Sequence, residues 1–228
     1  MRELGGWVPA SAPTLHVSVP AHASVRAPTG VRLHWGDTEA GPVAGVANIG
    51  EALIRCALDE DLEVSVPCFD WAWASGRLDL IGFESVVRAL PADARCIRDW
   101  IDPASQSILE SIARVRLKRH GWSVRSQIPV SGFGGIDLVI EDTVALETDG
   151  RTYHESSFET DRLKDLAITR AGRHAIQISR AMLLYNWAAI ESAITEALRA
   201  RGVVGKTGES LAEPRGRQRT PGRPELFT

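Results

Sequence analysis

Apolar and polar residues alternate with two different periods along the first half of the chain. A period of two predicts strands at residues 15–19 and 31–35, separated by turns that contain Pro and Gly. Spacings of three and four residues then predict three amphipathic helices, at 49–59, 64–74 and 83–90. These elements are expected to form an accessory domain over residues 1–103, because this part of the chain is acidic whereas the residues that follow are nearly neutral.

The second half of the chain begins with a helix and continues with strands. Pro103 suits the first turn of a helix that is predicted to run to His120 and to end at Gly121. Glu141–Thr143 is a polar segment between two β-branched runs and is short enough for a hairpin turn. The elements predicted after the helix are strands at 122–130, 136–140 and 144–147, a helix at 158–171, a strand at 173–179 and one long helix at 181–201. The order is α-β-β-β-α-β-α, which predicts an α/β domain over residues 104–202.

Each strand of the predicted hairpin has an acid where its pattern calls for an apolar residue. These acids are Asp137 and Glu147, and hairpin pairing would bring them close together. Two carboxylates about 4 Å apart repel by roughly 4 kcal/mol at an effective dielectric constant near 20, so such a pair favours a bound cation. Mg²⁺ and Mn²⁺ accept a few carboxylates and leave positions for water and phosphate oxygens. The residues alone therefore predict a hydrolytic metal site.

Composition narrows the class of protein. The chain has 228 residues, a hydrophobic content of 44% and a charged content of 24%, which are typical of a soluble globular protein. No apolar run is long enough to span a membrane, and the first residues lack the pattern of a signal peptide. Three widely spaced cysteines, an odd number, are expected to be buried thiols in a reducing cytoplasm. His34, beside Trp35 on a predicted strand, is expected to be a packed or edge residue.

Charge is unevenly distributed. Residues 1–103 carry 8 basic against 14 acidic side chains, whereas residues 104–202 carry 13 against 12 and residues 203–228 carry 5 against 3. The acidic region 1–103 is a candidate docking surface for a protein partner, and DNA would bind elsewhere because phosphates require Lys and Arg. The residues of the 103–120 helix that could bind nucleic acid are Arg114, Arg116, Lys118 and Arg119. The alternative for them is a solvated face with favourable charges at a helix C-terminus. The tail, 203–228, is rich in Gly, Pro and Arg and is expected to be disordered.

Four blocks of the second half resemble one branch of a known superfamily. The blocks are S-x-x-E at 107–110, G-I-D-L at 135–138, E-T-D-G-R-T-Y-H at 147–154 and F-E-T-D-R-L-K-D at 158–165. Their order and spacing resemble the Vsr-like endonuclease domains, kin of very-short-patch-repair enzymes, within the PD-(D/E)XK nuclease superfamily. The resemblance covers residues 104–202. It implies a restriction-endonuclease-like core and a nuclease activity that depends on Mg²⁺ or Mn²⁺.

The resemblance also implies a set of site residues. The catalytic candidates are Glu110, Asp137, Glu147, Asp149 and His154, and the candidate metal ligands are Asp137, Glu147 and the carbonyl of Thr148. The residues expected to support the site or to contact phosphate are Asp161, Arg162, Lys164 and Asp165. The superfamily's third motif is Glu-x-Lys, whereas this chain has Glu147-Thr148-Asp149. A migrated positive charge from Lys164 or Arg162 is the expected replacement for that lysine.

These expectations define one main function and two rivals. The main expectation is a cytoplasmic endonuclease that hydrolyses phosphodiester bonds in DNA, in repair, restriction or defence against phage and mobile elements. The missing motif lysine motivates the first rival, a weak or inactive nucleic-acid-binding regulator. The acidic region 1–103 motivates the second, a toxin–antitoxin-like interaction protein.

Overall fold

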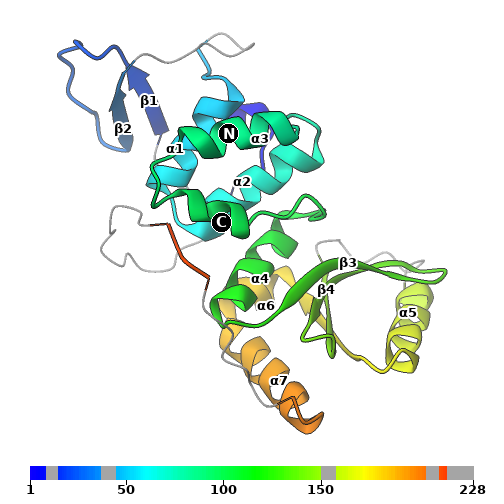
Figure 1. Ribbon diagram of the computed structural model, residues 1–228. Coiled ribbons are helices and arrows are strands. Elements are labelled where there is room, and N and C mark those ends of the chain that lie inside the picture. The colour runs from blue at the N-terminus through cyan, green and yellow to red at the C-terminus, as the bar shows by residue number, and fades with distance from the viewer. Residues whose placement is uncertain (9–14, 37–44, 150–157, 204–210, 215–228) are drawn as a thin grey trace. The chain divides into compact units, whose positions relative to one another are not determined.

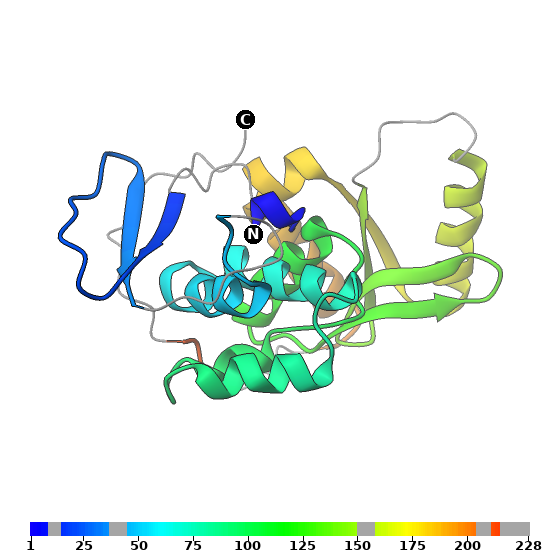
Figure 2. The ribbon, with the colours of Figure 1, turned by 90° about the horizontal axis from the view of Figure 1, so that it is seen from above.

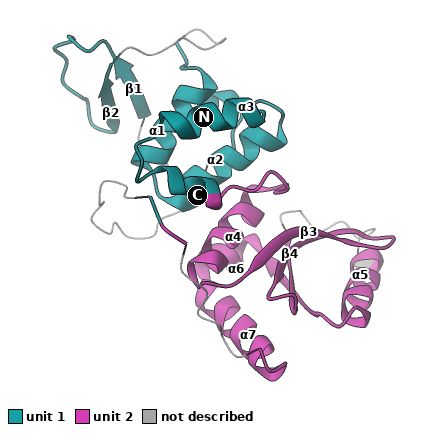
Figure 3. Ribbon diagram, viewed as in Figure 1, with its two compact units in different colours: residues 1–98, 213–228 teal, residues 99–212 magenta. Residues whose placement is uncertain are grey.

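The computed structural model divides the chain into two compact units (Figure 3). Unit 1 is Met1–Arg98 with Glu213–Thr228, and unit 2 is Asp99–Ala212. The residues that the structure describes are 1–8, 15–36, 45–149, 158–203 and 211–214. The division between Arg98 and Asp99 lies five residues before the predicted boundary at 103. Trp100 explains the shift, because it is fully buried and its indole N–H donates to the carbonyl of Ala212 at 3.0 Å, inside unit 2.

Unit 1 begins with a short 3₁₀ helix and a two-stranded sheet. The 3₁₀ helix is Arg2–Leu4, and the strands are β1, Leu15–Val19, and β2, Val31–Trp35. The strands have the predicted bounds and pair in parallel, with Ser18 opposite His34. A sheet of two strands is marginal by itself, so β1 and β2 depend on contacts with the rest of unit 1.

Three helices form the core of unit 1. They are α1, Ile49–Asp59, α2, Leu62–Ala74, and α3, Leu80–Ala89, followed by a 3₁₀ turn at Arg95–Asp99. The side chains of Asn48, Asp61 and Asp79 cap the three N-termini by accepting a backbone N–H. The aromatic residues fill the core: Trp73 lies 4.7 Å from Phe83 between ring centroids. The helices predicted in this region are confirmed, with α2 and α3 beginning two and three residues earlier than expected.

Unit 2 begins with α4, Ile108–Arg119, which starts later than predicted. Ser107 is the N-cap, and its hydroxyl accepts the backbone N–H of Glu110 at 3.2 Å. The prediction that Pro103 occupies the first turn is wrong, because Pro103 lies in a turn in which Asp102 accepts the N–H of Ala104. The cap places Glu110, a predicted site residue, in the first turn of the helix.

A four-stranded mixed sheet follows α4 (Figure 1). Its strands, in spatial order, are β3, Val124–Val130, β4, Gly134–Ile140, β5, Val144–Asp149, and β6, His174–Ser179. β3, β4 and β5 pair antiparallel, whereas β5 and β6 pair in parallel, with α5, Phe158–Arg170, between them in sequence. Figures 1 and 2 show α5 on one side of this sheet and α4 on the other. Unit 2 is therefore a mixed α/β domain, as the alternation of elements predicted.

The last predicted helix is two helices. They are α6, Arg180–Tyr185, and α7, Trp187–Ala200, and they meet at Asn186, whose φ of −138° and ψ of 36° are not helical. The single helix predicted at 181–201 is therefore wrong at this residue. The amphipathic face was read correctly, since Leu183, Ile190 and Ile194 are buried on both sides of the break.

Two further predictions concern burial and membranes. Cys56 and Cys68 are buried and Cys96 is partly exposed, and all three are free thiols. Among the described residues, no helix combines the length and the apolar character needed to cross a membrane.

Candidate functional site

The β4–β5 hairpin brings the two predicted metal ligands to the same end of the sheet. Its register pairs Leu138 with Leu146, and one further step along both strands places Asp137 opposite Glu147. One carboxylate oxygen of Asp137, Oδ2, accepts the backbone N–H of Thr148 at 2.8 Å and the Thr148 hydroxyl at 2.9 Å. These bonds fix the orientation of Asp137, whose other oxygen, Oδ1, lies 3.5 Å from the side-chain amide of Gln127.

Lys164 of α5 brings a positive charge to these acids. Its ammonium group lies 2.7 Å from Oε2 of Glu147 and donates to the carbonyl of Gly135 at 2.6 Å. Both side chains of this ion pair are more than four-fifths buried. Of the two cations predicted to replace the motif lysine, the structure places Lys164 at Glu147. Arg162 is exposed and pairs instead with Asp165 at 3.8 Å.

Glu110 reaches the site through a glutamine that the sequence analysis missed. Gln127 of β3 donates its side-chain amide to Glu110 Oε2 at 3.0 Å and lies 3.5 Å from Asp137 Oδ1. The backbone N–H of Gln106 also donates to Glu110 Oε2, at 2.9 Å. The strand pattern gives no reason to single out Gln127, but the β3–β4 register places it opposite Asp137.

The backbone of Gln127 is strained at this point. Its φ is +51°, a left-handed conformation that costs a residue with a Cβ about 1–3 kcal/mol. Gly135 permits this arrangement, because a Cβ at that position would lie 2.6 Å from Gln127 Oε1 and 3.3 Å from its backbone carbonyl carbon. Strained residues persist where the surrounding structure holds them, and here the strain aims an amide at two acids.

We expect Gly135→Ala to disturb the site as well as the fold. The new methyl group must displace the Gln127 side chain, which should cost about 1–3 kcal/mol of unfolding free energy and weaken binding of Mn²⁺. Gly132→Ala, in the neighbouring turn, is the control: its φ of +82° makes alanine strained, but no atom lies within 4 Å of the added methyl. Denaturant unfolding and Mn²⁺ titration of both variants check this. Equal Mn²⁺ binding by both would show that Gln127 does not support the site.

Burial changes the acidity of Glu147 and Glu110. It raises the pKa of Glu147 to about 7, against the opposing effect of Lys164, and the nearby charge of Asp137 raises it further. Burial also raises the pKa of Glu110, while the N–H of Gln106 lowers it and Asp137 raises it. Acids whose pKa is raised by burial are concentrated at functional sites, and they also occur in structural ion-pair networks.

This raised pKa should make stability depend on pH when no metal is present. Glu147 holds its proton more tightly in the folded chain than in the unfolded chain. Its contribution to the free energy of unfolding is therefore complete below pH 4.5 and is lost as the pH rises through about 7. The loss should reach roughly 3 kcal/mol at most. In EDTA, Glu147→Gln should therefore lose less stability than the wild type between pH 5 and about 8. Urea unfolding checks this, with Glu159→Gln, an exposed glutamate of α5, as control. Parallel pH profiles for all three proteins would contradict the expectation.

The acids at this end of the sheet fit a divalent cation. Glu147 Oε1 is buried and has no hydrogen-bond partner among the described residues. A buried carboxylate oxygen without a partner is costly, and a cation would satisfy it. The neighbouring Asp137 supplies a second carboxylate, and hard cations such as Mg²⁺ and Mn²⁺ prefer oxygen ligands of this kind.

The remaining predicted site residues differ in their exposure and in their contacts. Asp149 is exposed at the last position of β5, and Asp161 is exposed on α5. The side-chain amide of Gln177 donates to both carboxylate oxygens of Asp165 at 3.1 Å, and this contact joins α5 to β6. His154 lies outside the described residues. For Thr148, the structure shows its N–H and hydroxyl bound to Asp137, and the role of its carbonyl stays a prediction.

The basic residues of α4 mostly hold unit 2 together. Arg114 is 1% exposed and donates to the carbonyl of Trp100, so the prediction that it binds nucleic acid is wrong. Arg116 donates to the carbonyl of Leu183 and lies over the Trp187 ring at 5.3 Å. Lys118 donates to the carbonyl of Asp99 at 2.8 Å. For these two, and for the half-buried Arg119, contact with DNA stays a prediction.

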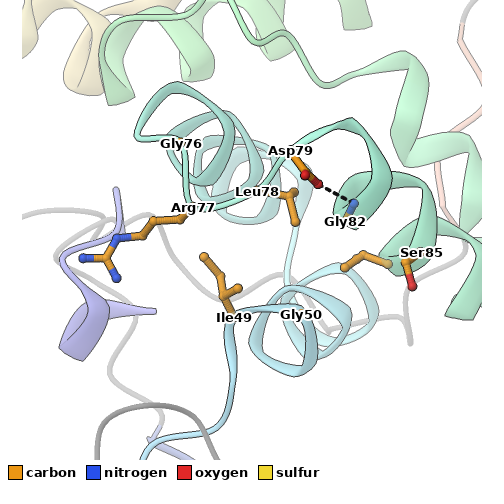
Figure 4. A pocket seen from close by; sticks show the side chains of 9 residues that line it. Ile49, Gly50, Gly76, Arg77, Leu78, Asp79, Gly82 and Ser85 are labelled. Atoms are coloured by element: carbon orange, nitrogen blue, oxygen red, sulfur yellow. Dashed lines mark hydrogen bonds between the residues drawn. The ribbon is translucent and has the colours of Figure 1, made fainter.

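A separate pocket lies in unit 1 (Figure 4). Its volume is about 410 Å³, and it lies between the start of α1 and the α2–α3 turn. Its one carboxylate, Asp79, is occupied as the N-cap of α3, accepting the N–H of Gly82 at 2.7 Å. The pocket therefore offers no converging set of reactive groups.

Comparisons of the chain with protein-family models, with curated proteins and with solved structures found no match. The resemblance to Vsr-like nucleases therefore remains a prediction from the four sequence blocks.

Proposed function

We propose that this protein is a divalent-metal-dependent endonuclease that cleaves DNA, with unit 2 as a PD-(D/E)XK core of the Vsr-like kind. One observation carries the proposal. Glu147 Oε1 is buried beside Asp137 and has no hydrogen-bond partner among the described residues, while Glu147 Oε2 pairs with Lys164. The succession α4-β3-β4-β5-α5-β6 also agrees with that core. Repair, restriction and defence against phage or mobile elements are the processes that such an activity would serve.

In this proposal Asp137 and Glu147 bind Mg²⁺ or Mn²⁺. When bound there, the cation would polarise the scissile phosphodiester and stabilise the charge that develops on its oxygens. Thr148 holds the carboxylate of Asp137 in place through two hydrogen bonds, and Gln127 holds Glu110 beside it. Glu110 is then positioned to accept a hydrogen bond from a water in the site.

Lys164 takes the place of the motif lysine. Its ammonium group is fixed by Glu147 and by the carbonyl of Gly135, and it can orient a water that attacks the phosphorus. His154 is expected to transfer a proton to or from this water or the leaving oxygen, since imidazole titrates near neutral pH. This assignment of His154 rests on the sequence alone.

One observation favours a second candidate, a weak or inactive regulator that binds nucleic acid or protein. Arg114, Arg116 and Lys118, which were expected to bind DNA, each donate to a backbone carbonyl within unit 2. Fewer cations for phosphate imply weaker binding of DNA. The lysine at Glu147 removes the original reason for this candidate, so the nuclease remains the better supported function.

Cleavage of supercoiled plasmid by the purified full chain tests the proposal. We expect nicked or linear DNA with Mg²⁺ or Mn²⁺ and none with EDTA. Single-stranded RNA in a parallel reaction reports whether the activity is confined to DNA. Binding of DNA without cleavage, in either metal and across pH 6 to 9, would favour the regulator.

A further inference from the structure

Two histidines of unit 1 face each other at the edge of a cavity. His16 of β1 and His34 of β2 point from the same side of the small parallel sheet, because their positions differ by an even number of steps in its register. Nδ1 of His16 lies 3.1 Å from Nε2 of His34, and His34 is 9% exposed. The cavity beside them, about 390 Å³ in volume, is lined by both histidines and by Glu60.

The outer nitrogen of each imidazole faces a carboxylate at the C-terminal end of α1. Nε2 of His16 lies 3.3 Å from Glu60 Oε1, and Nδ1 of His34 lies 3.7 Å from Asp59 Oδ2. The four groups form a row, Glu60–His16–His34–Asp59, with three contacts. Each contact needs one proton or one cation between its two lone pairs.

Two neutral imidazoles carry only two N–H groups, so one contact of the row lacks a proton. If the shared proton lies between the rings, either Glu60 or Asp59 faces a bare nitrogen lone pair. A third proton would make an imidazolium, and His34 is 9% exposed, so that charge would lie largely out of contact with water. A cation between the rings leaves both N–H groups free to donate outward to the carboxylates. Histidines that bind metals are commonly oriented by a carboxylate in this way.

We propose that His16 and His34 bind a divalent transition metal of the zinc class between their rings, with Asp59 and Glu60 facing their outer nitrogens. One potential ligand atom from each of His16, His34 and Asp59 lies within 4.8 Å of the others. Imidazole nitrogen suits Zn²⁺, Cu²⁺ and Ni²⁺ better than it suits Mg²⁺. The site would join the marginal two-stranded sheet to α1, and it lies in unit 1, whereas the acids of the proposed nuclease lie in unit 2.

The end of α1 and the charge of Arg32 affect the affinity of this site for a cation in opposite directions. Asp59 and Glu60 close α1, where the carbonyl end of the helix favours a cation and no basic residue lies in the last turn. Arg32 competes for the same charge, because its guanidinium lies 3.2 Å from Asp59 Oδ1. Arg32→Gln should therefore strengthen metal binding, whereas changes to the histidines should weaken it.

Calorimetric titration of the full chain with Zn²⁺, after dialysis against EDTA, tests the proposal. We expect a binding event whose Kd rises at least about tenfold in His16→Asn, His34→Gln and Glu60→Gln and falls in Arg32→Gln. His22→Asn, an exposed histidine between the two strands, is the matched control and should bind as the wild type does. Asp137→Asn combined with Glu147→Gln removes the acids of unit 2, and the binding event that depends on His16 and His34 should remain in that variant with the same Kd.

Circular dichroism separates loss of the site from loss of the fold. If His34→Gln unfolds unit 1, Zn²⁺ binding by His16→Asn and Arg32→Gln still tests the proposal. His16 is partly exposed, and Arg32→Gln is expected to change the Kd in the opposite direction. Unchanged Zn²⁺ binding in folded His16→Asn, or an equal loss in His22→Asn, would overturn the proposal. So would no Zn²⁺ binding by the wild type at micromolar protein.

Discussion

Replacing Glu147 with Gln is expected to reduce metal-dependent cleavage of DNA by at least about 10³-fold. A bound cation stabilises the charge of the transition state by several kcal/mol, and about 4 kcal/mol corresponds to that factor. The amide keeps the size of the carboxylate but loses the charge that the cation needs. Affinity for DNA should be retained, because the grip on phosphates comes from Lys and Arg rather than from this acid.

Initial rates of plasmid nicking measure this effect, with Glu159→Gln as the matched control. Glu159 is an exposed acid in the first turn of α5, the helix that carries Lys164. Cleavage by Glu147→Gln at the wild-type rate would assign the activity to a contaminant or to another part of the chain. The regulator would then be the better account of unit 2.

Replacing Lys164 with Met is expected to reduce cleavage by about 10²–10⁴-fold, the usual share of a group that positions and activates water. Two effects contribute, because the ammonium group also stabilises the charged form of Glu147. Without it the pKa of Glu147 rises further, so the rate should reach its plateau at a higher pH. If Lys164 also orients the attacking water, the rate of Lys164→Met should stay below that of the wild type on the plateau.

A pH–rate profile therefore separates the two contributions of Lys164. Arg170→Met, which removes an exposed cation from the last turn of α5, is the control for loss of a charge elsewhere in unit 2. Equal plateau rates for Lys164→Met and the wild type would limit Lys164 to an effect through Glu147. An unchanged profile would exclude any part for it in the reaction.

Local patterns predicted most of the elements, and the misses have local causes. The hairpin of β4 and β5 could be predicted because β-branched runs and a polar turn give the same answer. The start of α4 was missed because Pro103 and Ser107 are both good helix-start residues, and only the hydrogen bond from Glu110 decides between them. The break at Asn186 was missed because the apolar spacing continues across it.

Some residues of the candidate site could be predicted from local patterns and others could not. Asp137 and Glu147 were visible because acids are conspicuous on apolar strands. Gln127 was not, because a polar residue on a half-exposed strand is ordinary and its positive φ depends on the gap that Gly135 leaves. Arg114 was misread as a surface cation because sequence cannot show that its guanidinium binds the carbonyl of the buried Trp100. Residues whose role depends on distant backbone groups are the ones that local patterns miss.

The central claim is that Asp137 and Glu147 share a divalent cation. Anomalous diffraction from crystals soaked in Mn²⁺ tests it most directly, in the wild type and in Glu147→Gln. We expect a peak between the two carboxylates, about 2.0–2.3 Å from an oxygen of each, and no peak there in the variant. Carboxylates that point to opposite faces of the sheet, or a wild-type map with no peak between them at saturating Mn²⁺, would contradict the account.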